Sequence, residues 1–303
     1  MMNKYRKEWA LDTNIQKYRA LIEAVDQGSF SRAAEVLEYS QPGVSRMIAD
    51  LEHDWGVRLV ERGRSGVTLT SEGEKIMPYV RRVVEEDRLL HARIDDVNGL
   101  DVGTIRIGTF SSVATHWLPQ IIERFEKDYP HVDYELVMGD YAEIERWVMD
   151  GRVDCGFIAG KPRSKLDDML LDRDEMLAVV PDGQPRAQLA SCPLEALCAE
   201  PFMMLKQSGD TEVSGIFEHA GLKPQVRFVT WDDYAIMAMV EHGLGVSVLP
   251  SLILRRNPYH IVAKRLEMPA FRDIRVISRS GMSKVASKFM GYLRYRDDAA
   301  PAA

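Results

Sequence analysis

Polar side chains suited to hydrogen bonding with base edges lie close together in the first quarter of the chain. Gln41, Ser45 and Arg46 fall near the outer side of the first turns of a candidate helix. Glutamine can bond adenine through two hydrogen bonds, arginine can bond guanine, and serine can bond a base or a phosphate. Arginines that follow are suited to phosphate contacts, namely Arg58, Arg62 and Arg64. These residue types point to DNA binding, and a helical bundle with a polar face is the alternative that they leave open.

The elements that must hold these side chains are three short helices and a hairpin. Apolar residues recur every three or four positions from Ile15 to Val25, which predicts a first helix that ends at Gly28. Ser29 and Ser40 are suitable N-caps for two further helices. A helix-turn-helix places the start of its last helix in the major groove. We therefore expect helices at about Phe30–Leu37 and Gln41–Leu51, and wing strands at Leu59–Arg62 and Val67–Leu69 around a turn at Gly63–Gly66.

The order of short motifs in this region resembles the helix-turn-helix of LysR-type transcription regulators. The shared pieces are Gly28-Ser29-Phe30, Ala33-Ala34, Ser40-Gln41-Pro42, Ser45-Arg46, Leu51-Glu52, Gly56-Val57-Arg58-Leu59, Arg62 and Leu69-Thr70-Ser71-Glu72-Gly73. The resemblance implies an all-α winged helix-turn-helix over residues 1–70 that binds a pseudo-palindromic site on double-stranded DNA as a homodimer or homotetramer. The DNA contacts that we expect are Ser29, Ser31, Gln41, Pro42, Ser45, Arg46, Arg58, Arg62 and Arg64.

Residues 71–99 carry a heptad pattern that predicts a long linker helix. Its seam positions are spaced alternately by four and three residues, which is typical of two helices that pack against each other. The alternative is that the seam packs on the core of its own chain. Asp87 interrupts the apolar seam, and we expect it to meet an arginine at position 82 or 88 of a second subunit. The dimer seam consists of Ile76, Val80, Val83, Asp87, Leu90, Ile94 and Val97.

Beyond residue 100, strand and helix patterns alternate, which predicts parallel sheets with helices on both faces. The expected strands are Gly103–Gly108, Val132–Met138, Val153–Ala159, Leu177–Val180, Phe202–Leu205, Gln225–Val229, Gly245–Leu249 and Asp273–Ser278. The expected helices are Ser112–Tyr129, Ala142–Asp150, Thr211–Ala220, Asp232–His242 and Lys284–Tyr295. Pieces such as Ile105-Arg106-Ile107-Gly108 and Gly243-Leu244-Gly245-Val246 are similar to the effector-binding domain of LysR-type regulators. The resemblance implies a periplasmic-binding-protein-like α/β domain over 100–303, with one lobe at about 101–162 and 269–303 and the other at about 163–268.

Ligands of such folds bind at the carboxyl ends of strands and at helix N-termini. This rule selects residues after the first and third strands and before a helix that begins near residue 211. Hydroxyls and free backbone N–H groups there favour an anionic effector such as a carboxylate, and Lys206 adds positive charge. The alternative is that Ser112 and Ser208 serve only as N-caps. The expected effector contacts are Phe110, Ser111, Ser112, Phe157, Ala159, Lys206, Gln207 and Ser208.

Charge and composition limit the remaining function classes. The net charge of the whole chain is −7, yet residues 1–70 hold ten basic and ten acidic side chains and are neutral. A basic face can therefore still form there. No uncharged apolar run reaches the roughly 18 residues that a membrane helix needs, so we expect no membrane partner. Three cysteines and the lack of a secretory signal favour a reducing, cytoplasmic location.

No catalytic or metal-binding motif accompanies these elements. The sequence has no Walker loop, HExxH, GxSxG or CxxC, so we expect no enzyme activity, no metal and no cofactor. An enzyme on the same two-lobed fold is one rival, and it would need a nucleophile or metal that the sequence does not offer. A redox switch between Cys192 and Cys198 is the other, although nothing basic lies near either thiol in the sequence. The resemblance also implies DNA bending and contact with RNA polymerase.

Overall fold

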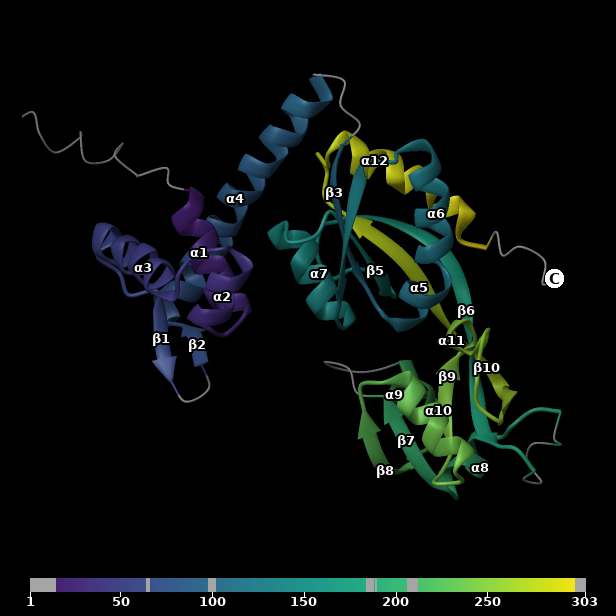
Figure 1. Cartoon of the computed structure of the whole chain (residues 1–303). Coiled ribbons are helices and arrows are strands. Elements are labelled where there is room, and N and C mark those ends of the chain that lie inside the picture. The colour runs from purple at the N-terminus through teal and green to yellow at the C-terminus, as the bar shows by residue number, and fades with distance from the viewer. Residues whose placement is uncertain are drawn as a thin grey trace, which may run out of the picture. The chain divides into compact units, whose positions relative to one another are not determined.

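The computed structural model describes residues 15–63, 66–97, 102–183, 188, 190–205 and 212–297 (Figure 1). The chain forms two compact units. The first extends to Ile94 and includes the short segment Asp150–Arg152, and the second contains the rest. Predictions that lie outside the described residues are those for Arg64, Lys206, Gln207, Ser208 and the side chain of Val97.

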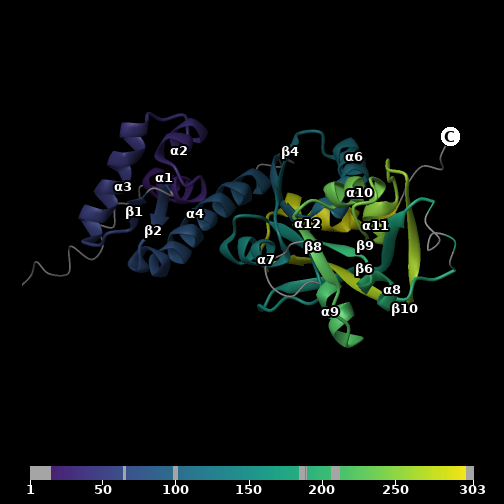
Figure 2. The same cartoon turned by 90° about the horizontal axis from the view of Figure 1, so that it is seen from below.

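Three helices, a hairpin and a long helix make up the first unit (Figure 2). The elements are α1 (Ile15–Asp26), α2 (Phe30–Val36), α3 (Gln41–Trp55), β1 (Val60–Gly63), β2 (Gly66–Leu69) and α4 (Ser71–Val97). The expected helices and wing strands are confirmed. Helix α3 extends further than predicted and ends at Gly56, which adopts the left-handed conformation that favours glycine.

Local hydrogen bonds and small residues explain why this unit folds as the sequence predicts. The hydroxyl of Ser29 accepts a hydrogen bond from the Arg32 N–H, and that of Ser40 accepts one from the Gly43 N–H, so both serines cap their helices. Ala33 and Ala34 are buried, which allows α2 to pack closely against its neighbours. The core of the unit also includes Leu21, Val44, Ile48, Leu51 and Leu59.

Two residues of the shared motifs, Glu52 and Gly73, hold the wing against the helices. One carboxylate oxygen of Glu52 accepts hydrogen bonds from the N–H groups of Leu59 (2.7 Å) and Val60 (3.1 Å). A Cβ atom at Gly73 would lie 2.1 Å from the Leu59 carbonyl oxygen, so only glycine lets the start of α4 approach β1 this closely. The motif residues Glu52 and Gly73 therefore position the wing and need not contact DNA.

The second unit is built around a six-stranded sheet in the order β4-β3-β5-β10-β6-β9, with a two-stranded sheet β7-β8 beside it. Its strands are β3 (Gly103–Thr109), β4 (Val132–Met138), β5 (Cys155–Ala159), β6 (Asp167–Pro181), β7 (Pro201–Leu205), β8 (Gln225–Thr230), β9 (Ser247–Pro250) and β10 (Ile261–Ser278). Its helices are α5 (Ser111–His116), α6 (Leu118–Asp128), α7 (Tyr141–Asp150), α8 (Leu194–Cys198), α9 (Glu212–His219), α10 (Asp233–Glu241), α11 (Ser251–Leu254), α12 (Lys284–Met290) and the 3₁₀ helix η2 (Gly291–Asp297).

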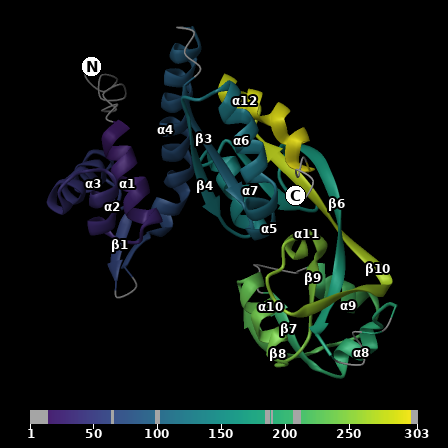
Figure 3. The ribbon, with the colours of Figure 1, turned by 45° about the vertical axis from the view of Figure 1, so that its right-hand side comes forward.

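Two lobes share this unit, and each has its own core. The core of the first lobe includes Ile107, Phe125 and Phe157. The second lobe has a core on each face of its sheet, because Val179 and Val180 on β6 point to opposite faces. Strands β6 and β10 run from one lobe into the other, side by side (Figure 3).

The structure corrects three expectations for this unit. Parallel pairing holds for β3 with β4 and β5 and for β7 with β8, but β10 pairs antiparallel with β5 and β6 because it returns from the second lobe. Strands β6 and β10 are much longer than predicted, since each crosses between lobes. The single helix expected from Ser112 is two helices, α5 and α6, that meet at Trp117; Pro119, near the start of α6, cannot donate a backbone hydrogen bond to α5.

Candidate DNA-binding face and effector cavity

The start of α3 is open to solvent. Gln41, Pro42 and Arg46 are exposed, and Ser45 is half-buried. This helix therefore presents the side chains that the sequence predicts for base contacts, and its apolar residues face the core instead.

Arg62 of the wing joins this surface to α2. Its guanidinium donates a hydrogen bond to the Ser45 hydroxyl (2.7 Å) and lies 4.4 Å from the centre of the Phe30 ring. The structure thus brings together Ser45 and Arg62, which are 17 positions apart in the sequence. Of the other expected contacts, Ser31 and Arg58 are exposed, and Ser29 is half-buried as a helix cap.

The predicted seam on α4 divides into two parts. Val80 is buried and Ile76 half-buried in the core of the first unit, so both pack on their own chain. The side chains further along remain open: Val83 is 46% exposed, Leu90 58% and Ile94 46%. A two-helix contact is therefore available only to the later part of the seam.

Asp87 has a partner within its own chain. Its carboxylate pairs with Arg19 of α1 at 3.2 Å, and the contact with an arginine of a second subunit stays a prediction. Arg88, one of the expected partners, pairs with Glu85 through two hydrogen bonds of 2.9 Å. The charge at position 87 is used to hold α4 against α1, because α1 packs beside α4 within this unit.

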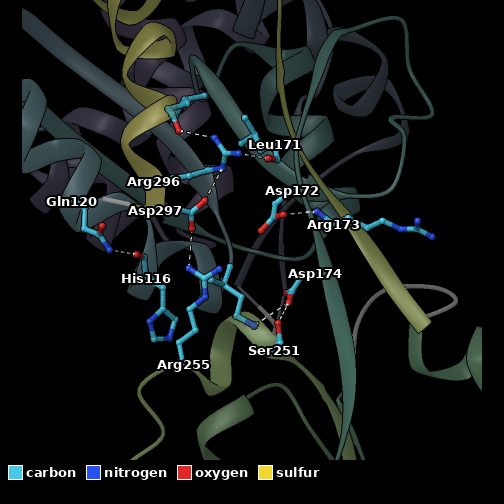
Figure 4. Close-up of polar contacts among 12 residues, drawn as sticks. His116, Gln120, Leu171, Asp172, Arg173, Asp174, Ser251, Arg255, Arg296 and Asp297 are labelled. Atoms are coloured by element: carbon cyan, nitrogen blue, oxygen red, sulfur yellow. Dashed lines mark hydrogen bonds and ion pairs between the residues drawn. The ribbon is translucent and has the colours of Figure 1, made fainter. Parts of the chain in front are cut away.

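A buried ion pair joins the two long strands of the second unit. Arg272 on β10 lies opposite Asp174 on β6, and their side chains are 5% and 2% exposed. Two guanidinium N–H groups donate to one oxygen of Asp174, at 2.8 and 2.9 Å. The other oxygen accepts from the Ser251 hydroxyl and the Leu252 N–H at the start of α11 (Figure 4). Burial alone would lower the pKa of Arg272, but Tyr141, Asp174 and Glu212 outweigh it and raise that pKa.

The same guanidinium reaches the first lobe. It donates to the Ser112 hydroxyl on α5 at 2.7 Å and to the Tyr141 hydroxyl on α7 at 3.2 Å. The Phe110 ring lies 5.1 Å from the guanidinium carbon and packs edge-on against Tyr141. Ser112 is therefore a partner of Arg272, and it does not cap α5, whose N-cap is Phe110.

A second contact between the lobes involves Ser111. Its hydroxyl hydrogen-bonds to the carboxylate of Asp233, at the start of α10. Burial raises the pKa of Asp233 to about 6, although Arg272 nearby and the bond from Ser111 both lower it. The preceding Asp232 is exposed and caps α10 by accepting from the Tyr234 N–H.

A cavity of about 570 Å³ opens beside this cluster. It is lined by Tyr141, Ala142, Glu145, Ile158, Ala159, Gly160, Lys161, Arg163, Arg173, Glu212, Phe271, Arg272 and Asp273. Of the expected effector contacts, Ala159 lines the cavity; Phe110, Ser111 and Ser112 do not, and Phe110 and Ser112 contact Arg272 instead. Phe157 is fully buried in the core of the first lobe, which does not agree with a ligand contact.

Comparisons with known proteins agree with these two units. Residues 15–74 match the model "Bacterial regulatory helix-turn-helix protein, lysR family", and residues 98–298 match "LysR substrate binding domain". The chain belongs to the LysR family. It is a DNA-binding transcription regulator with an effector-binding domain, as the sequence predicts, and the family consists of regulators and not of enzymes.

Relatives of this LysR-type regulator match it along most of their length. The probable regulator LrrA of Synechococcus elongatus is 31% identical and the regulator CysB of Haemophilus influenzae 30%, over 91% and 92% of this chain and 94% and 86% of theirs. Full-length CbnR in complex with its target DNA has the same fold, with a TM-score of 0.67 and 23% identity over 93% of this chain and 99% of that one. A full-length OxyR variant from Pseudomonas aeruginosa gives a TM-score of 0.69 and 21% identity, over 93% and 94%.

The central residues of the effector domain of this LysR-type regulator were not predicted from its sequence. Arg272, Asp174, Tyr141 and Asp233 occur in no short motif that indicates ligand binding. A usable signal exists for the ion pair: β6 and β10 carry opposite charges at matched positions, Arg173 with Asp273 and Asp174 with Arg272. That signal becomes visible only when the pairing of the two strands is known.

The thiols give no support to a redox signal. Cys192 is buried and Cys198 half-buried. Burial raises the pKa of the Cys198 thiol, and Glu195 adds to that effect, so its reactive thiolate is disfavoured. Within the described ranges, no group of three metal-ligating side chains and no helix able to cross a membrane is present.

Proposed function

We propose that the cavity beside Arg272 holds the small-molecule effector of this regulator and that the effector is anionic. The carboxylates that line the cavity have partners within the chain: Glu145 accepts from the Ser164 N–H, Asp273 lies 3.9 Å from Arg173, and Glu212 interacts electrostatically with Arg272. By contrast, Lys161 and Arg163 are exposed and have no ion-pair partner among the described residues. These two uncompensated cations at the cavity wall carry the proposal.

A thermal-shift screen of small carboxylates and amino acids on the full-length protein tests this function. Compounds that raise the unfolding temperature of the wild type should lose their effect when Lys161 and Arg163 are both replaced by alanine. Wild-type responses that survive this double replacement would place the effector elsewhere. A screen in which no compound has an effect would count against the anionic class.

We propose that Gln41, Ser45 and Arg46 contact base edges, while Arg58, Arg62 and the start of α2 contact the backbone. Replacing Arg46 by alanine should weaken binding to a specific site by about 1–3 kcal/mol, since one bidentate base contact is lost. Fluorescence anisotropy on DNA from upstream of the protein's own gene, at fixed salt, measures this change. Lys75→Ala, an exposed cation on α4, is the control and should leave the affinity unchanged. Equal affinities for both variants would remove Arg46 from the base contacts.

We propose that two chains pair through the exposed apolar side chains of α4, Val83, Leu90 and Ile94. Leu90→Glu should weaken the dimer at least about tenfold, because a charge would be buried in the contact. Sedimentation velocity over a concentration series measures this, and Val36→Glu, a similarly exposed apolar position on α2, is the control. A dimer that withstands Leu90→Glu would place the contact on another surface.

The remaining parts of the function follow from family resemblance. We propose a winged helix-turn-helix at 1–70, a linker helix at 71–99 and an effector-binding domain at 100–303, acting in the cytoplasm. Assembly into tetramers and contact with RNA polymerase belong to the same proposal. An effector can shift such an assembly only as far as its affinities for the two arrangements differ.

A further inference from the structure

Arg272 lines the effector cavity and also connects elements of both lobes. Its Nη2 donates to Ser112 in the first lobe and to Asp174. Asp174 in turn accepts from Ser251 and Leu252 on α11, a short helix that contributes Leu252 to the core of the first lobe and Ile253 to a core of the second. A displacement of this guanidinium therefore affects hydrogen bonds at both α5 and α11.

One N–H hydrogen of the Arg272 guanidinium is not used in a hydrogen bond to the described residues. A guanidinium has five N–H hydrogens. The Nε hydrogen and both Nη2 hydrogens bond to Asp174 and Ser112, and one Nη1 hydrogen bonds to Tyr141. The second Nη1 hydrogen has no partner among the described residues. It belongs to the same nitrogen that bonds the Tyr141 hydroxyl, and both residues line the cavity.

We propose that an anionic oxygen of the effector accepts this fifth hydrogen, and that Arg272 thereby passes the occupancy of the cavity on to the lobes. This inference rests on the proposed effector function of the cavity. A bound anion holds Nη1 while Asp174 holds the opposite edge of the guanidinium, so the side chain is fixed from both sides. The bond to Ser112 and the link through Asp174 to α11 are then strengthened together, which stabilises this arrangement of the lobes.

The charges near Arg272 determine how such an anion is accommodated. Asp174, Asp233 and Glu212 all lie within electrostatic range of the guanidinium, so the cluster carries more negative than positive charge. Lys161 and Arg163 at the cavity wall offset this excess for a ligand that reaches them as well. A dianion with separated carboxylates, such as succinate, meets both requirements and serves as the probe.

Arg272→Lys in the full-length protein is the deciding variant, because lysine keeps the charge but cannot form the fork of parallel bonds. Succinate binding is measured by calorimetry at about pH 7.5 and matched ionic strength, and hydrogen–deuterium exchange reports on α5 and α11. In the wild type, succinate should slow exchange in both helices. In Arg272→Lys, the affinity should fall at least about tenfold, and saturating succinate should no longer slow exchange. Arg265→Lys, an exposed arginine on the same strand that does not line the cavity, should stay within about twofold of the wild-type affinity and keep the exchange response.

Tyr141→Phe provides a second variant that leaves the buried ion pair intact. It removes the hydroxyl beside the fifth hydrogen and should weaken succinate binding about threefold to tenfold. Wild-type affinity in both Arg272→Lys and Tyr141→Phe overturns the contact. An unchanged exchange response at saturation in Arg272→Lys overturns the coupling. No effect of succinate on the wild type overturns the assignment of an anion to Nη1, whereas the effector function of the cavity is tested separately, by the compound panel and the double replacement of Lys161 and Arg163.

Discussion

The free energy of unfolding should fall by about 3–5 kcal/mol when Asp174 is replaced by asparagine. Asparagine keeps the shape of the side chain and can still accept from Ser251 and Leu252. It removes the negative charge, however, and leaves the buried Arg272 guanidinium without the counter-ion that hydrogen-bonds to it. An uncompensated buried charge costs far more than the loss of an exposed pair, so this substitution should be among the most damaging in the effector domain. Urea unfolding of the full-length protein, followed by a probe in the second unit, measures the loss.

Two further variants show whether the cause is charge. Asp273→Asn breaks the loose pair with Arg173, in which both partners are substantially exposed, and should change the stability by less than about 0.5 kcal/mol. Adding Arg272→Met to Asp174→Asn removes the stranded charge and should restore part of the loss. If Asp174→Asn and Asp273→Asn lower the free energy of unfolding by the same amount, the buried ion pair contributes no more to stability than the exposed one.

Asp233→Asn should have the opposite sign and stabilise the protein by up to about 3 kcal/mol at neutral pH. The pKa of Asp233 is raised from 3.8 to about 6 in the folded chain, chiefly by burial. A carboxyl group with a raised pKa ionises more readily in the unfolded chain, so above about pH 6 its charge opposes folding. Below pH 3.8 the group is neutral in both states, and this effect vanishes.

The predicted gain in the free energy of unfolding from Asp233→Asn should therefore appear as the pH rises from about 4 to about 6 and then stay constant. Unfolding curves of the variant and the wild type over this range isolate the contribution of this single group. Asp232→Asn is the matched control: the side chain is exposed and asparagine is an equally good N-cap, so its difference from wild type should be small at every pH. A gain that does not vary with pH would show that another property of asparagine causes it.

The DNA-binding unit could be predicted almost completely, because its signals are local. Ser29 and Ser40 cap the helices that directly follow them, and the spacing of apolar residues is enough to orient α1 and α3. Even so, the whole seam on α4 was predicted to form one contact between two subunits, whereas Val80 packs on its own chain and Leu90 does not. A heptad pattern predicts which residues share a helix face, but not which of them meets the core and which meets a second chain.

The effector site could be predicted only in outline. The rule about strand ends led to Ser111 and Ser112, and both lie in the central cluster. The groups that bond them, Asp233 and Arg272, come from the other lobe and from the returning strand, 160 positions away in the case of Ser112 and Arg272. The break between α5 and α6 is different: Pro119 is visible in the sequence, and its position should have divided the helix.

The pairing of β6 with β10 limits how the lobes can move. Both connections between the lobes are neighbouring strands, joined by backbone hydrogen bonds along most of their length. Neither can bend without bending its neighbour, so the two act mechanically as one ribbon. Its register is interrupted between Arg265 and Ala270 and between Ile274 and Arg275, and the buried ion pair lies between these two irregular places. We therefore expect the lobes to turn about a single axis. The section of the ribbon that holds the ion pair should be the stiffest, and the two irregular places on either side of it should bend more easily.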